Sequence, residues 1–106
     1  MNKNFKPYYA VIFSSLKNEA DYGYTEMALK MEQLAKEQPG FMGLESARNE
    51  IGITVSYWES IEAIANWKNN SEHLLAQQKG ISDWYKWYDI KICKVEREYS
   101  FGQKED

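Results

Sequence analysis

The segment Tyr8–Leu16 constrains the fold more than any other part of the sequence, because it is apolar on both of its faces. It is rich in aromatic and β-branched residues, which are typical of β-strands. Alternate side chains of a strand point to opposite faces. One face carries Tyr9, Val11 and Phe13, and the other carries Tyr8, Ala10, Ile12 and Leu16. A sheet built around this strand must therefore be covered on both sides.

The rest of the chain predicts helices and further strands. In Tyr24–Glu37, apolar residues recur every three or four positions, which is helical spacing, and Pro39-Gly40 ends that helix. Ser60 is a plausible N-cap for a later helix. The predicted strands are Tyr8–Leu16, Phe41–Arg48, Gly52–Trp58 and Asp89–Phe101.

Two regions of the second half are expected to be irregular. Asn69-Asn70-Ser71 interrupts the helix after Ser60, and Ser71 caps a second, short helix that ends at Gln78. Gly80–Tyr88 forms an aromatic connector. In the last strand the apolar positions change parity between Ile92 and Cys93, which indicates a β-bulge.

The order βαββαβ is that of a ferredoxin-like α+β fold, with a four-stranded antiparallel sheet and both helices on one face. The chain of 106 residues has room for one domain, 1–106, and we expect its ordered core over about 8–101. The helices leave one sheet face open, and an open face is normally polar at alternate positions. Here it is apolar, so we predict a homodimer in which two copies pack these faces together. The alternative is that the N-terminal arm and loops cover this face.

Composition excludes several classes of partner. The net charge of −3, without any basic run, argues against nucleic-acid binding. No apolar stretch approaches the roughly 20 residues that span a bilayer, and the polar start lacks a signal peptide, so we expect no membrane partner and a cytoplasmic location. One His and one Cys cannot make a zinc site, and no nucleotide-binding loop occurs. We therefore expect no metal and no cofactor.

Several short motifs occur in an order and spacing that resemble the antibiotic biosynthesis monooxygenase (ABM) domain family. They are Pro39-Gly40-Phe41-x-Gly43-x-Glu45, Tyr57-Trp58-Glu59-Ser60, Trp67-Lys68, His73 and Trp84-Tyr85. The resemblance runs from about Tyr8 to Phe101. It implies a dimeric α+β barrel with a pocket between sheet and helices in each protomer. Family members include cofactor-independent oxygenases of polycyclic aromatic compounds, haem-degrading oxygenases and proteins without known activity, so the fold alone does not give the reaction.

The candidate site residues each have a structural alternative. His73 is the only histidine, and its ordinary pKa near 6.5 suits acid–base catalysis. We consider it the candidate catalytic residue, with Gln77 assisting one helical turn further on, although it could simply pack beside the helix break. Four aromatic residues could stack on a flat substrate or fill the core. Together with Gln77, the candidate substrate-binding residues are Trp58, Trp67, Trp84 and Tyr88.

The haem-degrading subgroup fits poorly. Resemblance to it would require an Asn on the first strand and an axial His about ten residues beyond the helical Trp. The first strand holds no Asn, and His73 follows Trp67 by only six residues. The resemblance therefore implies a cofactor-independent monooxygenase acting on a small aromatic or quinol-like compound. A non-catalytic small-molecule binding module is the first alternative, and a haem-binding or haem-degrading protein is the second.

Overall fold

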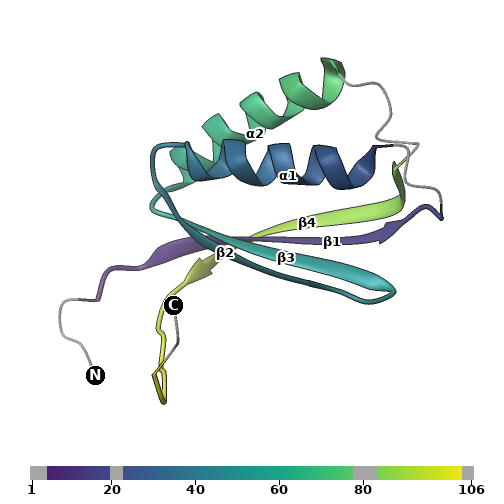
Figure 1. Ribbon diagram of the computed structural model, residues 1–106. Coiled ribbons are helices and arrows are strands. Elements are labelled where there is room, and N and C mark those ends of the chain that lie inside the picture. Colours follow the sequence, from purple (N-terminus) through teal and green to yellow (C-terminus); the bar gives the residue numbers. More distant parts are fainter. Residues whose placement is uncertain (1–4, 20–22, 78–83, 104–106) are drawn as a thin grey trace.

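The computed structural model describes residues 5–19, 23–77 and 84–103, with the side chains of residues 73–77 outside that description. A four-stranded antiparallel sheet in the order β2-β3-β1-β4 carries two helices on one face (Figure 1). The elements are β1 (Tyr8–Lys17), α1 (Tyr24–Lys36), β2 (Phe41–Arg48), β3 (Ile51–Trp58), α2 (Ile61–Gln77) and β4 (Tyr85–Val95). This is the predicted ferredoxin-like arrangement.

The strand register assigns each side chain to a face. Val11 of β1 pairs with Ser56 of β3 and Ile92 of β4, and these residues face the helices. The next residue of the central strand, Ile12, pairs with Val55 and Lys91 on the open face. Both faces of β1 are thus apolar, as the sequence predicts.

The core lies between the helices and the β3 side of the sheet. Trp58 is its centre: the side chain is fully buried, and its Nε1 donates to the Ser56 hydroxyl at 2.9 Å. Around it pack Val11, Ala35, Ala63 and Ile64, with Tyr9, Phe41 and Trp67 at the margin. The helices contact β2 and β3.

The turn between α1 and β2 requires glycine. Gly40 has a positive φ of 84°, and a Cβ at this position would lie 2.7 Å from the Cβ of Ala63. Its carbonyl accepts the Glu59 backbone N–H at 2.8 Å. Only glycine allows the turn to approach the start of α2 this closely.

The predicted break at Asn69-Asn70-Ser71 is wrong, because α2 runs without interruption from Ile61 to Gln77. Ser71 caps no second helix: its hydroxyl donates backwards to the Lys68 carbonyl at 3.0 Å. The Asn70 side chain has a hydrogen-bond partner outside α2, since its amide donates to the side chain of Gln38 in the α1–β2 turn at 2.9 Å. Ser60 caps the helix as predicted, accepting the Ala63 N–H at 3.0 Å.

The last strand also differs from the prediction. β4 begins at Tyr85, inside the predicted connector, and ends at Val95 instead of Phe101. The reason for its end is the partner strand: Val95 pairs with Tyr8, the first residue of β1, so later residues have no neighbour. The register is continuous through Ile92 and Cys93, and the irregularity lies instead opposite Leu16 and Lys17.

Candidate functional site

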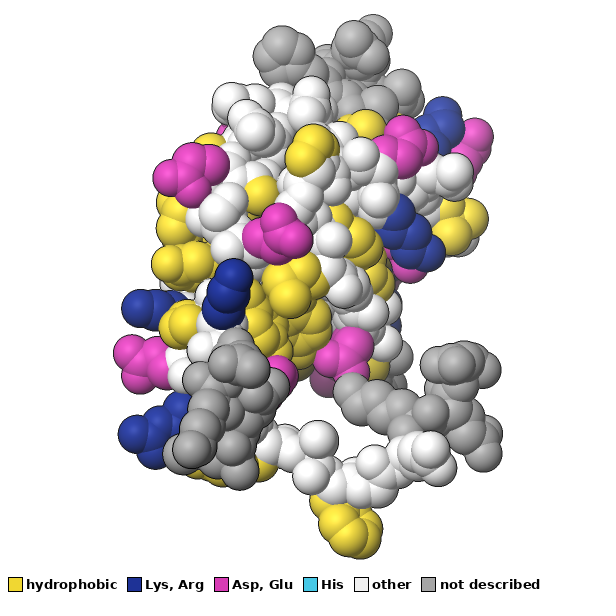
Figure 2. All heavy atoms as spheres, turned by 90° about the vertical axis from the view of Figure 1, so that its left-hand side faces the viewer, with side chains coloured by type: hydrophobic (Ala, Val, Ile, Leu, Met, Phe, Trp, Pro, Cys, Tyr) yellow, Lys and Arg dark blue, Asp and Glu magenta, His cyan; other side chains and the backbone are white. Residues whose placement is uncertain are grey.

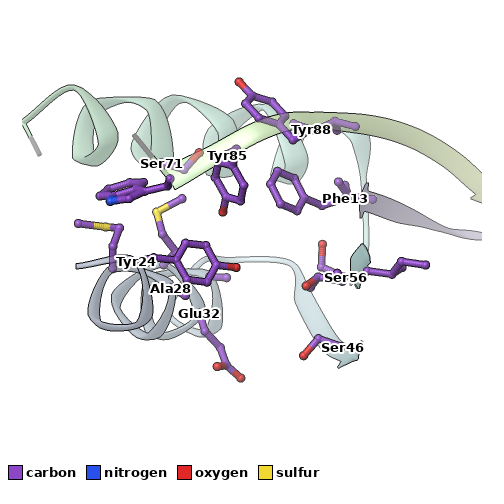
Figure 3. Close-up of a pocket in the computed structure, with 18 of the residues that line it drawn as sticks. Phe13, Tyr24, Ala28, Glu32, Ser46, Ser56, Ser71, Tyr85 and Tyr88 are labelled. Atoms are coloured by element: carbon purple, nitrogen blue, oxygen red, sulfur yellow. The ribbon is translucent and has the colours of Figure 1, made fainter. Parts of the chain in front are cut away.

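A cleft of about 1670 Å³ lies between the helices and the sheet, and every strand and both helices contribute to its lining. This volume exceeds the roughly 300–1,000 Å³ of typical small-molecule sites. Figure 3 shows aromatic side chains of β1 and β4 above the space, with Tyr24 of α1 and the serine hydroxyls of β2 and β3 below. The cleft can therefore accommodate a polycyclic compound.

Four aromatic rings pack together at the β4 side of the cleft. Phe13 stacks on Tyr88 with 5.4 Å between ring centroids, and Tyr85 contacts both rings edge-on. Tyr24 meets Tyr85 at 5.5 Å with the ring planes perpendicular. Rings in these arrangements attract one another beyond simple burial, so they form a continuous aromatic wall of the cleft.

Two tryptophans add to the lining. Trp84, the residue before β4, is 4% exposed, and Trp67 of α2 is half-buried. Trp67 stacks on the fully buried Trp58 behind it. Met27 and Met31 of α1 also line the cleft, and thioethers make favourable contacts with aromatic rings.

Arg48, the last residue of β2, reaches across the sheet into the same cleft. Its Nη2 donates to the Ser15 hydroxyl at 2.7 Å and to the Tyr24 hydroxyl at 3.2 Å. The path is open because Gly52 of β3 lies between Arg48 and Ser15 in the register, and a Cβ there would overlap the guanidinium. Three distant segments, β1, α1 and the β2–β3 hairpin, thus meet at one charged group.

Tyr85 remains protonated well above neutral pH. Burial raises the pKa of its phenol, and the charge and hydrogen bond of Tyr24 raise that pKa further, against a smaller lowering by Arg48. A buried phenol of this kind donates hydrogen bonds and does not act as a base at physiological pH.

The structure places the predicted site residues in three groups. Trp67, Trp84 and Tyr88 line the cleft. Trp58 is not among the lining residues and belongs to the core, which favours its structural alternative. His73 and Gln77 lie in the second half of α2, but their side chains are outside the described part. Because α2 is continuous, positions 67 and 73 are about 240° apart around its axis.

Sequence alone did not predict four residues of this site: Arg48, Ser15, Tyr24 and Tyr85. A signal was present at Gly52, since an isolated glycine inside a strand often marks a close approach by another group. Identifying that group as Arg48 requires the register of three strands. In residues 5–19, 23–72 and 84–103 no cluster of three or more His, Cys, Asp or Glu side chains suits a metal ion. No helix in the described part of the chain is long and apolar enough to cross a membrane.

Comparison with known sequences decides the family. The family model described as antibiotic biosynthesis monooxygenase matches residues 7–79. The chain belongs to the ABM family. It is also 53% identical over 99 residues to the uncharacterized protein YqjZ of Bacillus subtilis (strain 168), a match covering 92% of this chain and 87% of that one.

Solved structures share this ABM fold. SnoaB, a cofactor-independent oxygenase from Streptomyces nogalater, superposes in its N63A mutant form with a TM-score of 0.71 at 9% identity, covering 86% of this chain and 95% of its own. A protein of unknown function from Nitrosomonas europaea gives 0.70 at 7% identity, with 92% and 97% covered. At such identities these likenesses show the fold alone.

Proposed function

We propose that this protein is a cofactor-independent monooxygenase that acts on a small aromatic, quinol-like compound. The observation that carries the proposal is the cleft walled by Phe13, Tyr85 and Tyr88 between sheet and helices. Membership of the ABM family supports it. So does the shared fold of SnoaB, which is a cofactor-independent oxygenase.

In this reaction the substrate itself reduces O₂. The quinol-like compound reacts through a keto tautomer of the anthrone type, in which one ring carbon is a methylene. A proton leaves this methylene, and the resulting anion passes an electron to O₂. A carbon–oxygen bond forms to give a hydroperoxide, whose O–O bond then breaks. One oxygen stays on the carbon as a carbonyl, and the other leaves with both methylene hydrogens as water. The carbon loses four electrons and O₂ gains four, so the step needs no other reductant.

The protein has two tasks in such a step: to take a proton and to exclude water. We propose His73 as the proton acceptor, with Gln77 beside it, because the chain's one histidine is the side chain whose ordinary pKa lies nearest neutrality. The apolar and aromatic lining favours a dry environment around the reacting anion.

Oxygen uptake tests this function. Purified protein with a panel of quinols and anthrones should consume O₂ faster than buffer, without added flavin or metal. Ala28→Trp, which places a large ring in the cleft, should slow uptake at least ten-fold. Leu29→Trp is the matched control, because Leu29 is 62% exposed and outside the cleft lining. Thermal stabilisation by these compounds without any oxygen uptake would instead indicate a binding module.

We propose further that the open sheet face binds a second copy of this chain. Its centre is apolar, with Ala10, Ile12, Val55 and Ile53 on neighbouring strands. Charged residues stand at its edges: Lys91 on β4 and Glu45 on β2 occupy the two ends of one row. An apolar centre with a polar rim is typical of interfaces. A two-fold axis parallel to the strands would bring the Lys91 edge against the Glu45 edge of the other copy.

The segment after β4 supports the same interface. It leaves the sheet on the side away from the helices (Figure 1), and its Glu98 accepts a hydrogen bond from Tyr8 at 2.6 Å. Beyond that point Tyr99 and Phe101 are 77% and 105% exposed, and the segment stands clear of the body (Figure 2). A second copy on the open face would cover these rings.

A further inference from the structure

We propose that Arg48 and Tyr24 form an anion-binding subsite in the cleft, which selects aromatic compounds that carry an ionised oxygen. This inference rests on the proposed function for its biological meaning, since an oxygenase substrate of this kind reacts as an anion. The binding itself is a separate property of the cleft. It follows from the charges, the hydrogen bonds and the position of the guanidinium.

The charges that line the cleft are not balanced. Its two carboxylates are each close to a lysine: Glu32 lies 3.5 Å from Lys36, and Glu72 lies 3.9 Å from Lys68. Across residues 5–19, 23–72 and 84–103, by contrast, no carboxylate is within ion-pair distance of Arg48. A guanidinium held against neutral hydroxyls retains its full attraction for an anion.

A second cation strengthens the field at this end of the cleft. Lys17 Nζ lies 4.8 Å from the centroid of the Tyr24 ring, and the Arg48 guanidinium carbon lies 5.6 Å from it. Two positive charges therefore lie beside one phenol ring. The electrostatics therefore favour a negative oxygen near Tyr24 over a neutral one.

The hydrogen bonds leave donors for such an oxygen. The Tyr24 oxygen accepts from Arg48, and Tyr24 also shares a hydrogen bond with Tyr85. Two phenols have two protons, and one bond between them uses one, so the pair keeps one proton to donate. On Arg48, the contacts to the side chains of Ser15 and Tyr24 both come from Nη2. Its Nη1 makes one long contact of 3.5 Å to the Ser15 carbonyl, which leaves its second N–H for another acceptor.

The geometry holds these donors in place. The guanidinium lies over Gly52 and is fixed by Ser15, whose side chain is fully buried. Phe13 and Tyr88 stack beside the same cleft, so a flat ligand on these rings can direct one oxygen towards Tyr24 and Arg48. Planar donors at a fixed position recognise carboxylates and enolates alike.

Binding of unreactive probes tests the subsite without turnover. Lawsone is a naphthoquinone whose single hydroxyl ionises to an enolate below neutral pH, and its methyl ether is the neutral match. Naphthoate and naphthamide give the same comparison for a carboxylate. We expect the protein at neutral pH to bind lawsone at least ten-fold more tightly than its methyl ether, by quenching of tryptophan fluorescence and by calorimetry. A preference for naphthoate over naphthamide would extend the class to carboxylates, and its absence would restrict it to enolates.

Variants assign the preference to these residues. Arg48→Gln should remove the preference for lawsone, because it should weaken the binding of lawsone far more than the binding of the methyl ether. Arg97→Gln, which removes the same charge from the exposed segment after β4, should keep the preference. Tyr24→Phe should reduce the preference for lawsone at least three-fold. If Arg48→Gln does not fold, the Tyr24→Phe variant tests the subsite instead.

Three results would overturn the subsite: no binding of lawsone to the native protein, equal binding of lawsone and its ether, or an unchanged preference in the folded variants. Failure of the proposed function looks different, because it would appear as absent oxygen uptake while the preference for the enolate persists.

Discussion

The indole rings of Trp58 and Trp67 stack, with 6.0 Å between their centroids and 21° between their planes. This contact joins β3 to α2. It also separates the core from the cleft, because Trp58 is fully buried whereas the half-buried Trp67 lines the cleft. Two tryptophans that touch each other thus differ in their surroundings: Trp58 is enclosed by the core, whereas Trp67 also borders the cleft.

Truncation of the two rings should therefore have unequal effects on stability. We expect Trp58→Ala to lower the free energy of unfolding by about 3–5 kcal/mol, because it leaves a large cavity and an unpaired Ser56 hydroxyl. Trp67→Ala should cost less, since part of its surface is already exposed. Urea unfolding followed by far-UV circular dichroism measures both. A larger loss for Trp67→Ala would contradict this assignment.

Ser60, which precedes α2, and Ser71, which lies within it, provide a matched pair. Ser60→Ala should lower stability by about 1 kcal/mol, because the Ala63 N–H loses its acceptor at the helix start. Ser71→Ala should change it by less than about 0.5 kcal/mol, because the Ser71 hydroxyl bonds only to a carbonyl inside the helix. Equal losses in thermal and urea unfolding would show that Ser60 is not the cap.

These elements show what local sequence does and does not determine. Strand alternation in Tyr8–Leu16 and the cap at Ser60 are local signals, and both predict the structure correctly. The continuity of α2 through Asn69-Asn70-Ser71 is not local, since Asn70 finds its partner on Gln38, 32 residues away. The end of β4 depends likewise on where β1 begins.

The same distinction applies to the cleft. Aromatic richness suggested a wall for flat ligands, and Trp67, Trp84 and Tyr88 do line the cleft. Arg48 could not be assigned from sequence, because its approach to Ser15 depends on a register that spans three strands. The sequence signal for this contact is Gly52, which pairs with both Arg48 and Ser15.

Gly52→Ala tests that contact. The new methyl group would overlap the Arg48 guanidinium, which is the flexible end of a side chain, so the guanidinium should move and the fold should persist. We expect less than about 1 kcal/mol change in stability but a loss of the preference for lawsone over its ether. Gly52→Ala with an unchanged preference would show that the observed position of Arg48 is not needed for binding.

Alkaline pH should destabilise the protein through Tyr85. The folded state raises the pKa of this phenol above the value of about 10 expected in the unfolded chain. Its neutral form therefore contributes stability that is fully present below about pH 10 and decreases as the pH rises further. Urea unfolding between about pH 8 and 11 should show a steeper decline for the native protein than for Tyr85→Phe. Parallel curves would contradict the shift.

Tyr8, the first residue of β1, should also ionise only at high pH. A hydrogen bond to Glu98, followed by partial burial and the negative charge of that carboxylate, raises the pKa of Tyr8 to about 12. In a pH titration followed by tyrosinate absorbance, Tyr8→Phe should therefore show one fewer phenol that ionises above the usual pH range than the native protein does. Glu98→Gln should bring that titration back towards about pH 10.

Self-association should depend on the open sheet face. We expect the native protein to sediment as a dimer at micromolar concentration and Ile12→Glu to sediment as a folded monomer, because it puts a charge in the apolar centre. Leu29→Glu, on the exposed side of α1, is the control and should remain dimeric. A native monomer would remove the proposed interface.

Isotope incorporation tests the central claim most directly. Protein free of flavin and metal is incubated with each of a panel of anthrones under heavy-isotope oxygen gas, and the product is analysed by mass spectrometry. The account predicts one labelled oxygen atom in each product molecule, formed at a rate that Ala28→Trp lowers and Leu29→Trp does not. Unlabelled product, or turnover no faster than in buffer with folded protein across the whole panel, would contradict it.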